Sequence, residues 1–104
     1  MKYLSRMVIL VAVAGMAAFT PARAKSYPGQ LRYGAQASIS LQQAERIALK
    51  AFSGQIISKE LEKERGGSGL RYSFDIRRGK VVHEVGVDAK TGEVLENSID
   101  NDSD

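Results

Sequence analysis

The sequence contains no cysteine and no tryptophan, and it has a single histidine, His83. The absence of cysteine excludes disulfides, thiol nucleophiles and lipid attachment to cysteine. One histidine needs three further ligands to build a zinc site, and the HExxH pattern does not occur. A serine nucleophile needs a base and an orienting group, and no pattern in the sequence supplies them. The sequence therefore predicts a protein that is not an enzyme and holds no metal or cofactor.

An excess of charge of one sign is also missing from most of the chain. The whole sequence has 15 Lys and Arg against 12 Asp and Glu, but Lys2, Arg6 and Arg23 lie in the first 24 residues, which contain no acidic residue. Residues 25–104 therefore carry 12 basic (15 − 3) and 12 acidic side chains. A neutral domain lacks the basic surplus that nucleic-acid binding requires, so no nucleic-acid partner is expected.

Residues 1–24 have the three-part pattern of a secretory signal peptide. Lys2 and Arg6 precede the apolar and small residues 7–19, and Ala22-Arg23-Ala24 offers small residues to a signal peptidase. Thirteen residues in a helix extend roughly 20 Å, which is short of the roughly 30 Å hydrocarbon core of a membrane. The prediction is cleavage after Ala24, a periplasmic or secreted location, and no stable membrane insertion afterwards.

Residues 25–38 show no hydrophobic period and contain Pro28, Gly29 and Gly34. This composition predicts a flexible linker between the cleavage site and the folded domain. The alternative is that Tyr27 and Tyr33 make the segment a short docking element.

A helix is predicted over about 41–53. Ser40 and Gln43 form a capping box, and apolar residues then recur at helical spacing. Gly54 is expected to end the helix in a left-handed conformation. The alanines on the apolar side indicate close approach to a flat partner such as a sheet.

Alternating apolar and polar residues predict strands over 57–62, 70–77 and 81–88, with a short strand from 94. Short turns between them make the sheet antiparallel. The fold class expected for residues 39–99 is therefore α+β, with one N-terminal helix packed on a three- to four-stranded antiparallel sheet. The predicted hairpin register pairs Ile76 with Val81 and Phe74 with His83, because an odd loop would exchange the two sides.

The segment 88–93, which includes Thr91, is predicted to be a tight turn in which the Asp88 carboxylate accepts local backbone N–H groups and Gly92 takes positive φ. Residues 100–104 are predicted to be a solvated acidic tail. Their alternating aspartates match the first three ligands of an EF-hand loop, but the glycine and glutamate of that loop are missing.

Two surfaces are candidates for binding a partner. The first is the edge of the first strand, at Ser58, Lys59 and Glu60, where strand addition needs no catalytic residue. The second is the outward side of the next strand, at Arg71 and Arg77. The neighbouring Glu60, Glu62 and Glu64 are interpreted as a solvated strand because basic residues interleave with them. His83 is interpreted as a partly buried strand residue, with pH sensing as the alternative.

Two segments of the chain resemble the PepSY family. The first is Ile39–Leu49 with Gly54, which resembles the opening helix of PepSY domains, and the second is Val85–Leu95, which resembles the terminal Asp…Thr-Gly turn between apolar strands. The resemblance covers about 39–97 and implies a stand-alone exported PepSY protein. PepSY domains occur in propeptides of thermolysin-type metallopeptidases and in spore-cortex regulators. The resemblance thus implies a protein-binding module that restrains a peptidase or similar envelope partner. The alternative is an accessory sensor domain that acts on a membrane receptor kinase.

Overall fold

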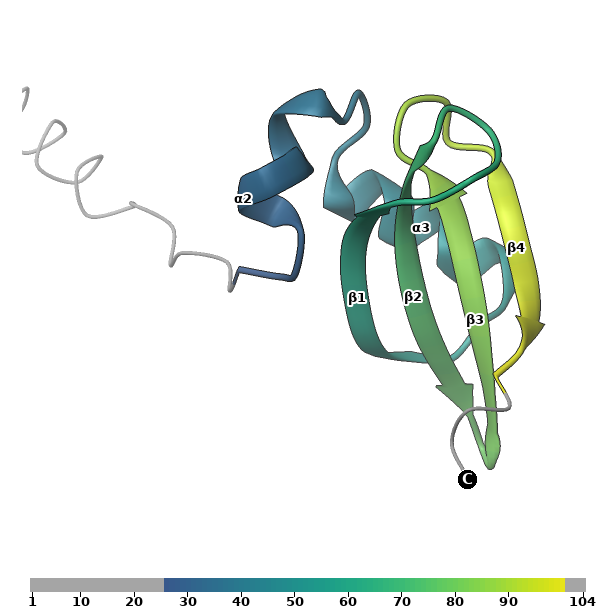
Figure 1. Cartoon of the computed structure of the whole chain (residues 1–104). Helices are drawn as coiled ribbons and strands as arrows, with labels where there is room; N and C mark the ends of the chain where they lie inside the picture. The colour runs from purple at the N-terminus through teal and green to yellow at the C-terminus, as the bar shows by residue number, and fades with distance from the viewer. Residues whose placement is uncertain (1–25, 101–104) are drawn as a thin grey trace, which may run out of the picture.

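The computed structural model describes residues 26–100, which form one helix-on-sheet domain with a helical segment at its N-terminal side (Figure 1). The four strands are arranged in the order β1-β2-β3-β4, and each neighbouring pair is antiparallel. This arrangement confirms the predicted α+β class. The elements are α2 (Gln30–Tyr33), a 3-10 helix η1 (Gly34–Gln36), α3 (Leu41–Ala51), β1 (Gln55–Lys63), β2 (Leu70–Arg78), β3 (Val81–Asp88) and β4 (Val94–Ile99).

The predicted capping box starts α3. The Ser40 hydroxyl accepts a hydrogen bond from the Gln43 N–H at 3.1 Å, and the Gln43 side chain accepts one from the Ser40 N–H at 2.8 Å. Two helix N–H groups that lack partners inside a helix are thereby satisfied. Ala44 and Ala48 are completely buried, so the small side chains let the helix axis approach the sheet closely.

The end of α3 differs from the prediction. The helix stops at Ala51, and Gly54 is not among the residues with positive φ. Gly54 instead passes so close to the end of β2 that a Cβ atom there would overlap the carbonyl oxygen of Arg77. The glycine is therefore needed for a close approach of two backbones and not for a left-handed helix cap.

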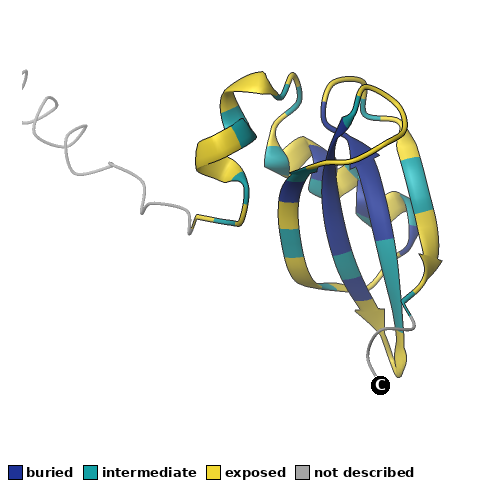
Figure 2. Cartoon of the chain, viewed as in Figure 1, coloured by how far each residue is buried: buried dark blue, intermediate teal, exposed yellow. Residues whose placement is uncertain are grey.

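The core lies between α3 and the inner side of the sheet, and β2 and β3 contribute most of it (Figure 2). α3 packs on β2, β3 and β4, whereas β1 is contacted by α2. The largest completely buried apolar side chains are Phe74, Leu61, Leu70, Ile76, Val85 and Val87. Apart from Leu61, all come from the two central strands.

The β2–β3 register differs from the predicted register by two residues. Ile76 pairs with His83 and Phe74 with Val85, because the two-residue loop is Gly79-Lys80. A shift of two keeps every side chain on its predicted side of the sheet, so the burial pattern alone could not detect it. The position of the loop depends instead on Gly79, whose φ of +64° suits a tight hairpin turn.

The segment predicted to be a linker carries α2 and η1 in the structure. Tyr27 and Tyr33 pack against the core, and the Tyr27 ring lies 6.4 Å from the Tyr72 ring, centre to centre. The Leu61 N–H donates a hydrogen bond to the Pro28 carbonyl at 2.9 Å. Residues 27–36, called the N-terminal segment below, therefore cover part of β1, as in the docking alternative.

Residues 1–25 and 101–104 lie outside the described residues, and with them the predicted signal peptide and most of the acidic tail. Within residues 26–100, no helix combines the length and apolar character that crossing a membrane requires.

Candidate functional site

The side of the sheet that faces away from α3 carries carboxylates from all four strands. Cross-strand pairing places Glu60 and Glu96 in one row with Ser73 and Gly86 between them, and Asp75 and Glu84 in the next row. This surface is called the carboxylate face below, and it also includes Glu62. None of its carboxylates combines into a group of metal ligands among residues 26–100.

The sequence did not reveal this clustering. Lys59 and Lys63 alternate with the glutamates of β1, but alternate residues of a strand point to opposite sides of a sheet. The basic side chains therefore lie on the inner side, and the glutamates meet Asp75 and Glu84 from the neighbouring strands. Cross-strand neighbours become visible only when the register is known.

Burial and crowding on this face raise the pKa of Glu84 to about 7. Burial is the largest cause, followed by repulsion from Glu96 and Asp75 and smaller repulsions from Asp100 and Glu62. The pKa of Glu60 is raised for the same two kinds of reason. Both mechanisms disfavour the charged carboxylate.

Arg71 is the positive charge within the carboxylate face, and it is 6% exposed. Its Nη1 lies 3.4 Å from the Glu96 carboxylate, its Nη2 donates to the Arg65 carbonyl at 2.8 Å, and its Nε lies 4.0 Å from Glu64. Nε has no hydrogen-bond partner among the described residues. Arg71 therefore neutralises its own surroundings and offers little surface to a partner.

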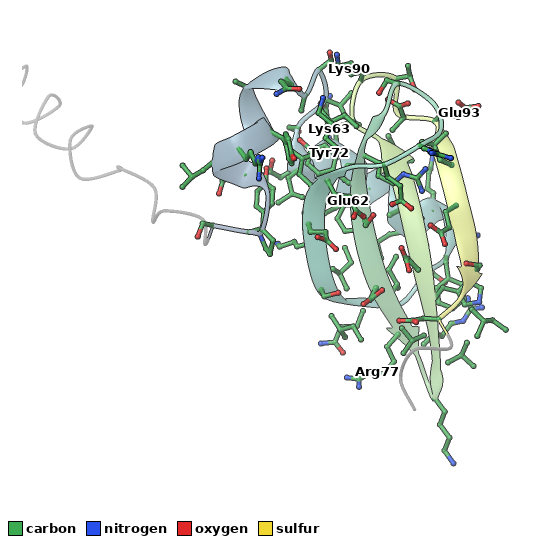
Figure 3. All side chains as sticks on the ribbon, viewed as in Figure 1. Glu62, Lys63, Tyr72, Arg77, Lys90 and Glu93 are labelled. Carbon is green, nitrogen blue, oxygen red and sulfur yellow. The ribbon has the colours of Figure 1, made fainter. Side chains whose placement is uncertain are left out.

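Arg77, the second basic residue of that candidate surface, is exposed near the end of β2. Figure 3 shows it at the opposite end of the domain from Lys90. Arg71 and Arg77 are six residues apart in one strand, or roughly 20 Å. The structure thus does not bring these two residues together, but it pairs Gln55 of β1 with Arg77.

The predicted residues Ser58, Lys59 and Glu60 lie in β1, which is an edge strand as expected. Ser58 donates to the Asp75 carboxylate at 2.8 Å on the carboxylate face. Lys59 points to the inner side, where its Nζ lies 3.1 Å from the Glu45 carboxylate. Ser58 and Glu60 therefore face the carboxylate face and Lys59 faces the inner side, and what the three residues share is the backbone of one sheet edge.

The two halves of this edge differ. The Leu61 N–H points away from β2, because it bonds to Pro28 of the N-terminal segment. Alternate residues of an antiparallel strand direct their N–H and C=O groups to the same side, so those of Lys59 also point outward. No backbone hydrogen bond from residues 26–100 reaches the outer side of β1 at Lys59. The N-terminal half of the β1 edge is therefore uncovered.

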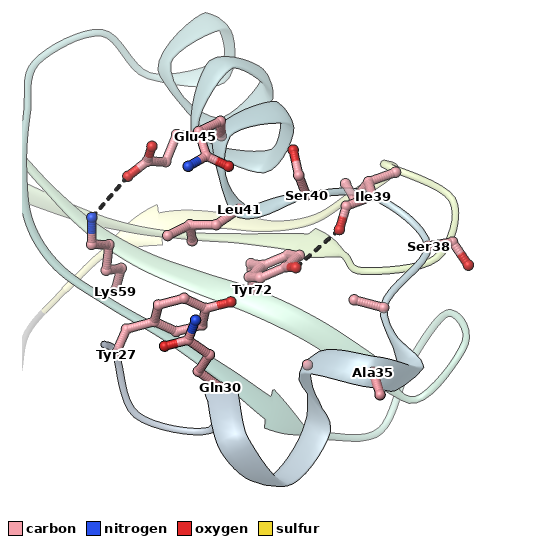
Figure 4. A pocket seen from close by; sticks show the side chains of 13 residues that line it. Tyr27, Gln30, Ala35, Ser38, Ile39, Ser40, Leu41, Glu45, Lys59 and Tyr72 are labelled. Carbon is pink, nitrogen blue, oxygen red and sulfur yellow. Dashed lines mark hydrogen bonds and ion pairs between the residues drawn. The ribbon is translucent and has the colours of Figure 1, made fainter. Parts of the chain in front are cut away.

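A groove of about 780 Å³ lies between the N-terminal segment and the start of α3 (Figure 4). Tyr27, Tyr72 and Leu41 contribute apolar surface, and the Lys59–Glu45 ion pair closes one end. The Tyr72 hydroxyl donates to the Ile39 carbonyl at 2.9 Å. Burial, with a smaller contribution from Tyr27, raises the pKa of Tyr72 to about 12, so this hydroxyl stays protonated.

Asp88 holds two turns together at the end of the sheet. Its completely buried carboxylate accepts hydrogen bonds from the Ser68 N–H at 2.6 Å and hydroxyl at 2.8 Å, and from the N–H groups of Lys90 at 2.8 Å and Thr91 at 3.1 Å. Gly92 follows with a φ of +82°. The sequence predicted hydrogen bonds to Asp88 within segment 88–93, but it did not predict that the glycine-rich turn at 65–69 is attached to Asp88 through Ser68.

His83 lies on the inner side of β3, beside Phe52 and not beside Phe74. Its ring is stacked on the Phe52 ring with centres 3.7 Å apart and planes 7° apart. Its Nδ1 is 2.8 Å from the Asn97 side-chain oxygen. These contacts fit the interpretation of His83 as a packed strand residue.

We expect Glu84→Gln to stabilise the domain at alkaline pH. A pKa raised from 4.5 to about 7 means that the folded state loses stability as pH rises through about 7. The glutamine side chain does not ionise, so the variant does not lose this stability. The difference in stability between the variant and the wild type should therefore grow from about pH 5 to about pH 8. Melting temperatures across this range measure it, and Glu93→Gln, outside the face, is the control. An equal gain at both positions would contradict the crowding at Glu84.

Comparison with known families gives one match. A family model described as PepSY, peptidase propeptide and YPEB domain, matches residues 38–97. No curated protein and no solved structure matches the chain. The matched range contains α3 and all of the sheet except the last two residues of β4, and it begins after the N-terminal segment.

Proposed function

The chain belongs to the PepSY family, and from this membership we propose that it is an exported, non-enzymatic module that binds and restrains a peptidase or a similar envelope protein. The observation that carries the proposal is the match to a peptidase-propeptide family over residues 38–97, more than half of the 104-residue chain. Residues 1–24 have the pattern of a signal peptide, which supports export to the periplasm or the medium. Mass spectrometry should find the N-terminus of the exported protein at Lys25, and recovery of the intact chain from membranes alone would contradict cleavage after Ala24.

The proposed binding site is the uncovered half of the β1 edge, around Ser58, Lys59 and Glu60. A partner strand would bond to the outward N–H and C=O groups of Lys59 and run toward Gln55, which pairs with Arg77. A bulge between Ile56 and Ser58 interrupts this half, so only a partner that fits the bulge is accepted. Peptidases bind extended chains in their clefts, and the same backbone geometry serves strand addition. Arg71 is proposed to take part only indirectly, by holding the carboxylate face together.

Inhibition assays test the function directly. The chain from Lys25 onward is added to a panel of exported metallopeptidases, and we expect the activity of at least one to fall in a saturable manner. Lys59→Pro should weaken inhibition about tenfold or more, since it removes an outward N–H while leaving the bonds to β2 intact. Arg77→Glu should weaken it more than Lys90→Glu, the same charge change at the other end of the domain. The absence of inhibition for every enzyme of the panel would contradict the proposed function. Inhibition of equal strength by the wild type and by all three variants would contradict only the proposed binding site.

A second candidate function is that of an accessory sensor domain that acts on a membrane receptor kinase. The carboxylate face favours it, because burial together with repulsion from neighbouring carboxylates raises the pKa of Glu84 to about 7, where a small change in pH changes the surface charge. Pull-downs from the native envelope at about pH 5 and about pH 8 distinguish the two functions. A receptor captured at only one of these pH values, and lost with Glu84→Gln, would support the sensor over the inhibitor.

A further inference from the structure

The two edge strands differ in how they are protected against pairing. β1 carries a bulge, the basic Lys59, and a hydrogen bond from Leu61 to the N-terminal segment. Bulges, lysines and covering segments all discourage unselective pairing of an edge strand, so β1 resists self-association and accepts only a partner that fits its bulge. β4 contains no lysine and no proline, and its single irregularity lies near its start, at Leu95. Within residues 26–100, β3 alone makes backbone ladder bonds to it, and Figure 1 shows β4 at the edge of the sheet opposite β1.

The outward backbone N–H and C=O groups of β4 lie next to an exposed apolar side chain. The Asp100 N–H donates to the Val82 carbonyl of β3 at 2.8 Å, so the even-numbered residues from 96 onward face β3. The N–H and C=O groups of Asn97 and Ile99 consequently point away from the sheet. The Ile99 side chain is 61% exposed. Exposed apolar surface at an unpaired strand edge favours association with another strand.

We propose that β4 pairs with β4 of a second copy of this chain, antiparallel, about a two-fold axis. Charge selects the register. Pairing Asn97 with Asn97 of the second copy sets Glu96 opposite Ser98, and Ile99 opposite the irregular position Leu95, with no like charges opposed. Moving the pairing by one step in either direction sets Glu96 opposite Glu96 or opposite Asp100 of the second copy. Like charges directly opposite each other destabilise a strand pair, so only the central register is favourable.

This dimer joins two four-stranded sheets edge to edge and leaves β1 at both outer edges. The proposed partner site therefore stays accessible in each copy, and one dimer presents it twice. An edge with so few outward backbone groups makes a small interface, so we expect weak, concentration-dependent association. The inference depends on β4 and not on the proposed function.

Sedimentation equilibrium of the chain from Lys25 onward tests the proposal. We expect a monomer–dimer equilibrium below about 1 mM, a concentration at which an association of only about −4 kcal/mol is still detected. Ile99→Lys should leave a monomer, because it removes the exposed apolar side chain and sets a charge opposite Leu95, where no acidic residue faces it. Leu31→Lys is the matched control. Leu31 is 100% exposed on α2, which packs on β1 at the opposite edge of the sheet from β4, so this variant should leave dimerisation unchanged.

Ser98 tests the register in both directions. Ser98→Glu faces Glu96 of the second copy twice in the dimer and should weaken association about threefold to tenfold, whereas Ser98→Lys should strengthen it at low salt. Circular dichroism of each variant confirms that the fold is intact. A wild-type monomer at about 1 mM overturns the proposal. Equal effects of Ile99→Lys and Leu31→Lys, or the same direction of change for both Ser98 variants, overturn it as well.

Discussion

Phe52→Ala is expected to leave the domain largely unfolded at room temperature. Phe52 is 6% exposed at the end of α3, where its ring stacks on His83 and lies 4.2 Å from the Arg78 guanidinium carbon. Truncating a buried phenylalanine costs about 3–5 kcal/mol, because apolar contacts are lost and a cavity remains. Small domains have free energies of unfolding of about 5 kcal/mol, so this cost is most of the total stability.

Urea denaturation followed by circular dichroism measures this effect. Tyr33→Ala is a suitable control, since Tyr33 is a partly buried aromatic residue of the N-terminal segment and not of the core. We expect the control to lower the midpoint by a fraction of the Phe52→Ala shift. Similar midpoints for wild type and Phe52→Ala would show that the ring contributes no packing between helix and sheet.

The sequence predicted the elements of the fold because their signals are local. The Ser40 capping box, the alanines of α3 and the period-2 alternation of β2 each depend on residues that are close together in the chain. Docking of the N-terminal segment was only the alternative prediction, because its contacts are single and distant in the sequence. Tyr27 contacts Tyr72, and the Pro28 carbonyl accepts a hydrogen bond from Leu61, but no repeating pattern in the sequence indicates these contacts.

The candidate site was predictable only in part, for the same reason. The edge position of β1 follows from the order of the strands along the chain. The burial of Arg71 does not follow from the strand order, because it depends on contacts with Glu96 of β4 and with Arg65 in the β1–β2 turn. The carboxylate face likewise requires four strands in register, and a two-residue error in register changes which carboxylates meet while leaving every side chain on its predicted side.

Asp88, Thr91 and Gly92 belong to the second of the two segments that resemble PepSY domains, and the structure gives these residues a physical role. Asp88 is a buried anion that ties the β3–β4 turn to the glycine-rich β1–β2 turn through Ser68. Burial by itself would raise the pKa of Asp88, but the hydrogen bonds from Ser68, Lys90 and Thr91 outweigh it and lower the pKa to about 2. The motif is therefore a structural anchor of the fold.

Asp88→Asn is accordingly expected to be among the most damaging single substitutions. The amide cannot accept all four hydrogen bonds, and its NH2 group would face other donors. Hydrogen bonds to a charged group contribute about 1.5–3 kcal/mol each, and the donors left buried without partners add to the loss. We expect a cost of at least about 4 kcal/mol at neutral pH, which places the variant among the severe cases. Asp75→Asn is the matched control, because it removes a carboxylate from the crowded face and should be neutral or stabilising.

The same residue gives a pH signature that a simple packing defect would lack. A folded pKa of about 2, against 3.8 for the free side chain, means that the ionised Asp88 stabilises the fold above about pH 4. That contribution, about 2 kcal/mol, is lost as pH falls from about 4 to about 2. Denaturation midpoints over this range should therefore fall more steeply in the wild type than in Asp88→Asn, measured in a background stable enough to keep the variant folded. Parallel pH profiles for the two proteins, or equal midpoints for Asp88→Asn and Asp75→Asn, would show that Asp88 does not anchor the two turns.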